Sequence, residues 1–83
     1  MRVLYFAWVR ERIGTGEETV SPPAEVSTVG ALVDWLAGRS EGHRAAFTDR
    51  ARLRAAVDGA FVPLDAPIAG ADEVAIFPPV TGG

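Results

Sequence analysis

Two apolar segments, one near each end of the chain, constrain the fold more than any other feature. Val3 to Val9 form a continuous apolar run with β-branched and aromatic side chains, and Glu73 to Phe77 form a second strand-like segment. A strand with apolar side chains on both faces has to be covered on both, so it lies near the middle of a sheet. We therefore expect these two strands to be central, adjacent and parallel.

The remaining strands are short, and turn residues separate them. Gly14-Thr15-Gly16 predicts a turn, and Glu17 to Val20 then predict a strand antiparallel to the first. Leu53 to Val57 and Phe61 to Leu64 predict two further strands, and the Asp58-Gly59 dipeptide between them is a strong signal for a two-residue hairpin. These segments complete a mixed sheet.

One amphipathic helix is predicted between the second and third strands. Apolar residues recur there at i, i+3, i+4 and i+7, which places them on one face of a helix: Val29, Leu32, Val33 and Leu36. Ser27 or Thr28 can cap its first turn, and Gly38 lies where a C-terminal cap belongs. This helix covers one face of the sheet.

The element order β-β-α-β-β-β, with the first and last strands central and parallel, is the β-grasp architecture, an α+β fold. We expect residues 1–77 to form the domain and residues 78–83 an extended C-terminal tail. One helix leaves the second face of the sheet uncovered. That face carries an apolar set: Leu4, Phe6, Trp8, Phe61 and Phe77. An exposed apolar patch of this kind marks a partner surface, unless loops fold over it.

The composition excludes several classes of function. The 83 residues make one domain, and they include no cysteine, no lysine and one histidine, which excludes disulfides, thiolate metal sites, cysteine nucleophiles and Schiff-base lysines. The formal net charge of −3 argues against non-specific nucleic-acid binding. The short apolar start suits neither a signal peptide nor a membrane span, so we expect a cytoplasmic protein.

The single histidine, His43, lies in a segment predicted to hold a short helix around Ala45 to Phe47. The sequence places no second metal ligand or catalytic base near it. A surface or helix-capping role is therefore the interpretation for His43, and no metal site is predicted.

The C-terminal residues Phe77-Pro78-Pro79-Val80-Thr81-Gly82-Gly83 carry the chemistry. Proline has no N–H to donate, so the sheet ladder should end at Pro78, and the glycines can lie in a channel too narrow for a Cβ. No side-chain group in the sequence supports catalysis, which leaves the carboxylate of Gly83. An ionised carboxylate is a poor electrophile and must be activated, for example as an acyl-adenylate. Sulfide attack would then give a thiocarboxylate, and amine attack an amide.

These residues resemble a known family. The ending from Phe77 to Gly83, the opening Phe6-Ala7 with Arg10-Glu11 and the segment Ala56-Val57-Asp58 are similar to the small subunit of molybdopterin synthase. The similarity spans essentially the whole chain. One departure is Asp58, where the family commonly has Asn, and both residues tolerate a turn conformation.

The resemblance implies a ubiquitin-like β-grasp sulfur carrier without a permanently bound cofactor. A ubiquitin-activating-like adenylyltransferase would adenylate Gly83 with ATP, and a sulfurtransferase would supply the sulfur. The thiocarboxylated tail, which includes Gly82 and residues 78–81, would insert into the large synthase subunit. There it would donate sulfur to cyclic pyranopterin monophosphate, which builds the molybdopterin dithiolene of molybdenum cofactor biosynthesis. The resemblance also implies a heterotetramer in which three aromatic residues contact the large subunit, Phe6, Phe61 and Phe77, and no standalone active site.

Three alternatives stay open at this stage. The chain could carry sulfur for thiamine or tRNA thiolation, it could be a ubiquitin-like modifier of protein lysines, or it could be a plain β-grasp binding module. The sequence identifies neither the activating enzyme nor the sulfur source, and it leaves the oligomeric state of the isolated chain undetermined.

Overall fold

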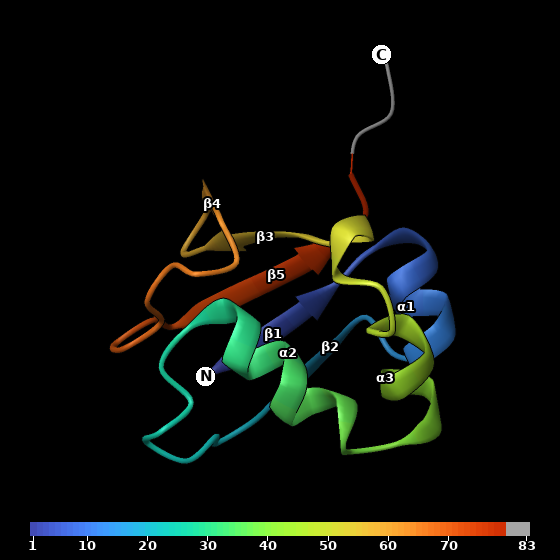
Figure 1. Ribbon diagram of the computed structural model, residues 1–83, viewed down its shortest axis with the longest axis horizontal. Coiled ribbons are helices and arrows are strands. Elements are labelled where there is room, and N and C mark those ends of the chain that lie inside the picture. The colour runs from blue at the N-terminus through green and yellow to red at the C-terminus, as the bar shows by residue number, and fades with distance from the viewer. Residues whose placement is uncertain (80–83) are drawn as a thin grey trace.

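The computed structural model describes residues 1–79. These residues form a mixed five-stranded sheet with the strand order β2-β1-β5-β3-β4 (Figure 1). β1 and β5 pair in parallel at the centre, and every other pairing is antiparallel, so the predicted β-grasp arrangement is confirmed. The strands are β1 (Arg2–Tyr5), β2 (Glu17–Thr19), β3 (Arg54–Val57), β4 (Ala60–Val62) and β5 (Glu73–Phe77).

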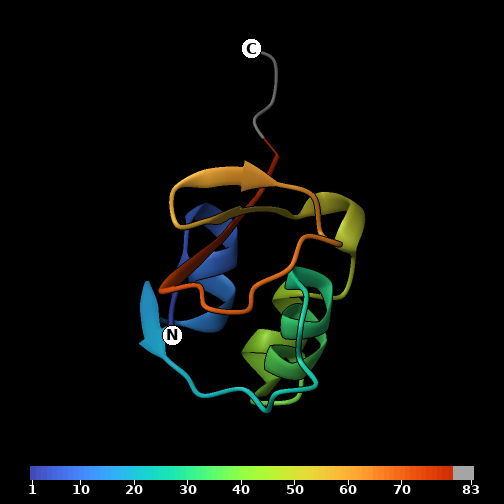
Figure 2. The same ribbon diagram turned by 90° about the vertical axis from the view of Figure 1, so that its left-hand side faces the viewer.

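The helices are α1 (Ala7–Ile13), α2 (Val29–Ala37), α3 (Glu41–Ala46) and the 3₁₀ helix η1 (Arg50–Arg52). Figure 2 shows α2 and α3 together on one side of the sheet. The core lies between these helices and the strands, where Val3, Val74 and Ile76 are fully buried. None of the helices within residues 1–79 is long and apolar enough to cross a membrane.

The predicted helix corresponds to α2, and its apolar stripe faces the core. All four stripe residues are fully buried: Val29, Leu32, Val33 and Leu36. Burial of each such side chain stabilises the fold by about 1.5–3 kcal/mol. Thr28 is the N-cap, since its hydroxyl accepts a hydrogen bond from the Ala31 N–H at 3.1 Å.

The predicted first strand from Val3 to Val9 is wrong in its second half. β1 ends at Tyr5, and α1 begins at Ala7, whose φ of 53° turns the chain away from the sheet. Val9 and Ile13 lie one helical turn apart, and the fully buried Val9 anchors α1 to the core. The element order therefore has an additional helix between the first two strands.

The Asp58-Gly59 hairpin is confirmed, and it joins β3 to β4 at the edge of the sheet. Asp58 and Gly59 have φ values of 47° and 85°, the left-handed conformations that a two-residue hairpin requires. The Asp58 carboxylate also accepts hydrogen bonds from the N–H groups of Asp72 and Glu73, at 3.0 and 2.9 Å. The turn is thereby fixed to the start of β5.

Candidate functional site

The sheet face opposite α2, which we call the open face, carries a row of apolar side chains. The strand register aligns Leu4, Ala75, Ala56 and Phe61 across four neighbouring strands. Phe77 lies two residues beyond Ala75 on β5, and its ring packs against that of Phe61 with the ring centroids 5.6 Å apart. Phe61 is 84% exposed, although burial in a partner would be favourable for a ring of this size. The open face therefore has the character of an interaction surface.

A shallow hollow of about 230 Å³ lies beside these two rings, and Arg54 and Val62 contribute to its lining. Arg54 is the cross-strand partner of Phe77. Its guanidinium donates to the carbonyls of Ala51 and Leu53, at 3.2 and 2.8 Å, which fixes a positive charge at the edge of the hollow.

The other two aromatic residues predicted for this face differ in their placement. Phe6 is the N-cap residue of α1, is 47% exposed, and lines a separate hollow with Leu4 and Arg10. Trp8 is not on the open face, because the strand that was expected to carry it is α1 instead. Its ring is half-buried against the core. Phe61 and Phe77 are therefore the predicted pair that the structure brings together.

The C-terminal tail starts at the end of β5. Figure 1 shows the chain leaving the sheet there, at the end of the molecule where α1 begins and η1 lies. Pro78 and Pro79 are half-buried and follow Phe77 directly. The four tail residues on which the predicted chemistry depends lie outside the described residues: Val80, Thr81, Gly82 and Gly83.

A buried polar cluster connects three elements, and the sequence analysis missed it. His43 is 7% exposed, so the predicted surface role is wrong, and Ser40 caps α3 instead. His43 Nε2 lies 2.5 Å from Glu18 Oε2, and its Nδ1 lies 2.7 Å from Ser40 Oγ. The Tyr5 hydroxyl donates to the same Glu18 oxygen at 2.6 Å. No local pattern reveals this cluster, since Glu18 and His43 are 25 residues apart.

The electrostatics of the cluster favour an ionised Glu18. Burial raises the pKa of Glu18, but hydrogen bonds from Tyr5 and His43 and the charge of Arg39 outweigh it, so the pKa is lowered overall. Burial raises the pKa of Tyr5, and its hydrogen bond to Glu18 raises it further. The cluster therefore joins β1, β2 and α3 through one carboxylate, on the helix-covered side of the sheet.

Relatives of the chain are known. It is 45% identical over 83 residues to the molybdopterin synthase sulfur carrier subunit of Escherichia coli (strain K12), with 100% of this chain and 99% of the relative covered. It is 32% identical to the protein of the same name from Haemophilus influenzae, with the same coverage, and 36% identical to that of Mycosarcoma maydis, with 100% and 92% covered.

Two solved structures have the same fold. SAMP1 from Haloferax volcanii matches with a TM-score of 0.73 and 29% identity, over 100% of this chain and 98% of that one. A Pyrococcus furiosus protein described as molybdopterin converting factor subunit 1 matches with a TM-score of 0.74 and 31% identity, over 95% of each chain. A family model, that of the ThiS family, matches residues 3–83. The resemblance seen in the sequence is confirmed, and the chain belongs to the ThiS family.

Proposed function

We propose that this chain is the sulfur carrier subunit of a molybdopterin synthase, and that Gly83 carries the sulfur. The observation that carries the proposal is the extent of the match: 45% identity to a sulfur carrier subunit over 83 residues, within a family match that runs to Gly83. The similarity thus includes the C-terminal residues as well as the β-grasp domain.

The proposed chemistry takes place at the C-terminal carboxylate. A ubiquitin-activating-like adenylyltransferase transfers AMP from ATP to the Gly83 carboxylate and releases pyrophosphate. Sulfide delivered by a sulfurtransferase then attacks the acyl carbon and displaces AMP, which leaves a thiocarboxylate. Gly82 and Gly83 carry no Cβ, so the tail is narrow enough to enter the active site of another subunit. There the thiocarboxylate sulfur attacks a carbon of cyclic pyranopterin monophosphate and displaces an oxygen substituent from it. Hydrolysis of the resulting thioester leaves the sulfur on the pterin and returns the carboxylate. Each dithiolene needs two sulfurs and therefore two charged tails.

The open face is the proposed docking surface for the large subunit. Phe61 and Phe77 form its aromatic pair, and Phe6 lies at the start of α1 near Leu4. Residues 1–77 would act as the docking domain, and residues 78–83 as the tail that reaches the substrate. Because β5 carries Phe77 and leads directly into the tail, docking on this face would also fix where the tail begins. The complete assembly would contain two small and two large subunits.

Reconstitution tests this function. The thiocarboxylated chain, incubated with the large subunit of the same organism and cyclic pyranopterin monophosphate, should form molybdopterin. A chain without Gly82 and Gly83 serves as the control and should form none. Transfer of the sulfur to a thiamine precursor or to tRNA, with no molybdopterin formed, would favour the alternative carrier role. An amide link to a protein lysine would favour the modifier role.

A further inference from the structure

Trp8 and Arg12 on α1, together with Arg52 on η1, form a cationic surface. Arg12 Cζ lies 5.3 Å, and Arg52 Cζ 5.0 Å, from the centroid of the Trp8 ring. These distances allow cation–π interactions, which hold the guanidinium groups in place. We call the set of Trp8, Arg12 and Arg52 the arginine platform.

Within residues 1–79, neither Arg12 nor Arg52 forms an ion pair with a carboxylate. The arginine ion pairs there are Arg2–Glu73, Arg39–Glu18 and Arg50–Asp34, and none involves Arg12 or Arg52. Asp49 lines the same hollow, which has a volume of about 320 Å³, and its carboxylate accepts a hydrogen bond from the Ala51 N–H. The hollow is therefore lined by two arginines and one carboxylate, which leaves an excess of positive charge. Both platform arginines are exposed. Guanidinium groups held in this way are well suited to paired hydrogen bonds with carboxylates.

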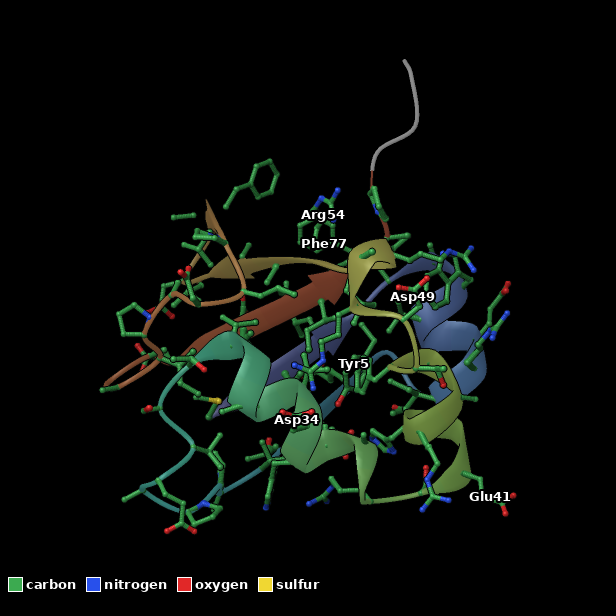
Figure 3. All side chains as sticks on the ribbon, viewed as in Figure 1. Tyr5, Asp34, Glu41, Asp49, Arg54 and Phe77 are labelled. Carbon is green, nitrogen blue, oxygen red and sulfur yellow. The ribbon has the colours of Figure 1, made fainter. Side chains whose placement is uncertain are left out.

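Arg54 links the platform to the open face. It is two residues from Arg52, pairs across the strands with Phe77, and donates to backbone carbonyls at the end of η1. Figure 3 shows Arg54 beside Phe77, with Asp49 at the same end of the molecule. A protein that covers Phe77 therefore needs to extend only past Arg54 to reach the platform.

We propose that the arginine platform binds acidic side chains, Asp or Glu, on the large subunit that covers the open face. This inference rests on the proposed function. A net charge of −3 on the chain disfavours the accumulation of a small free anion at long range. A protein already held on the open face instead presents its carboxylates at a high effective concentration. The platform thus forms a charged margin of the apolar interface, where charge complementarity sets orientation and association rate.

The test compares Arg52→Gln with Arg50→Gln by calorimetry against the purified large subunit, at low and at high salt. Both residues belong to η1 and both changes remove one charge, but Arg50 points to Asp34 on α2. Arg52→Gln should weaken binding about three- to fivefold at low salt, and the difference from wild type should vanish at high salt. Arg52→Glu should weaken binding further, and Arg50→Gln should stay within roughly twofold of wild type. Thermal unfolding of each variant checks that the fold is retained.

Equal affinities of Arg52→Gln and Arg50→Gln at low salt would overturn the inference and leave the proposed function standing. A wild-type chain that does not bind the large subunit would overturn both. A third arm adds ATP or inorganic phosphate and follows the Trp8 indole resonance by NMR. If the Trp8 resonance shifts and Arg52→Gln leaves binding to the large subunit unchanged, the platform binds a phosphate ligand and the inference is wrong.

Discussion

The Glu18 carboxylate shows how one residue can hold a small fold together. It accepts hydrogen bonds from Tyr5 on β1 and His43 on α3, while the residue itself belongs to β2. A buried carboxylate without partners would be strongly destabilising, whereas one with charge-assisted hydrogen bonds contributes to stability. Glu18 therefore couples the edge of the sheet to the helical layer.

Removal of this charge should change the pH dependence of stability. The pKa of Glu18 in the folded state lies below its ordinary value of 4.5. The ionised carboxylate therefore contributes fully to the free energy of unfolding above pH 4.5, and this contribution is lost as the pH falls through the folded-state pKa. Glu18→Gln should lower the free energy of unfolding by about 1–3 kcal/mol at neutral pH, and it should weaken the dependence of this free energy on pH in the acidic range. Urea unfolding at a series of pH values measures this. Glu17→Gln, a change at the exposed neighbouring residue, is the control and should retain the wild-type profile.

At the scale of elements, the sequence predicted the sheet better than the helices. Apolar character on both faces of the first and last strands was sufficient to place them at the centre, and Asp58-Gly59 was sufficient to place the hairpin. The helix α1 was missed, because Val3 to Val9 is apolar at every position and lacks a break between strand and helix periodicity. The i, i+4 spacing of Val9 and Ile13, followed by Gly14 as a C-cap, is the signal that could have revealed it.

For the candidate site too, residues on strands were predicted better than residues on helices. Phe61 and Phe77 could be predicted on one face of the sheet, and the structure shows that their rings are in contact. Trp8 could not be placed once the strand ended early, and its contacts with Arg12 and Arg52 depend on tertiary packing. The contact between Glu18 and His43 joins residues that no local periodicity relates.

The packing of α1 against α3 depends on Gly42. A Cβ at this position would lie 2.5 Å from the Arg12 carbonyl oxygen, which is backbone and cannot rotate away. Gly42→Ala should therefore lower the free energy of unfolding by about 1–3 kcal/mol, which denaturant titration can measure. Gly38→Ala is a suitable control, because its nearest contact would be at 3.6 Å. If Gly42→Ala is as stable as Gly38→Ala, then α1 and α3 can move apart without a loss in the free energy of unfolding, which would contradict this prediction.

At the scale of the whole molecule, Phe77 of the proposed docking surface is the last residue of β5, and the tail starts directly after it (Figure 1). Phe61→Ala should weaken binding to the large subunit by about 1.5–3 kcal/mol, since an exposed ring would be buried in the complex. The isolated domain should stay folded, because Phe61 is 84% exposed in the free chain. Calorimetry with the purified large subunit measures the affinity, and an unchanged value would argue against docking on the open face.

A residue added after Gly83 should abolish sulfur transfer without affecting the fold. The reacting group is proposed to be the terminal carboxylate, and a displacement of about 1 Å can already cost on the order of a hundredfold in rate. The same thermal unfolding midpoint with and without the extension would show that the domain is intact. Molybdopterin formation by a chain with an uncleaved C-terminal tag would contradict the proposed role of Gly83.

The most direct test of the account is the mass of the intact chain after incubation with the adenylyltransferase, ATP and a sulfur source. The account predicts an increase equal to the difference between sulfur and oxygen, located at Gly83 by peptide mapping. Addition of the large subunit and cyclic pyranopterin monophosphate should then reverse this increase. An unchanged mass, or an amide link to a protein lysine in place of the thiocarboxylate, would contradict the claim that this chain carries sulfur on its C-terminal glycine.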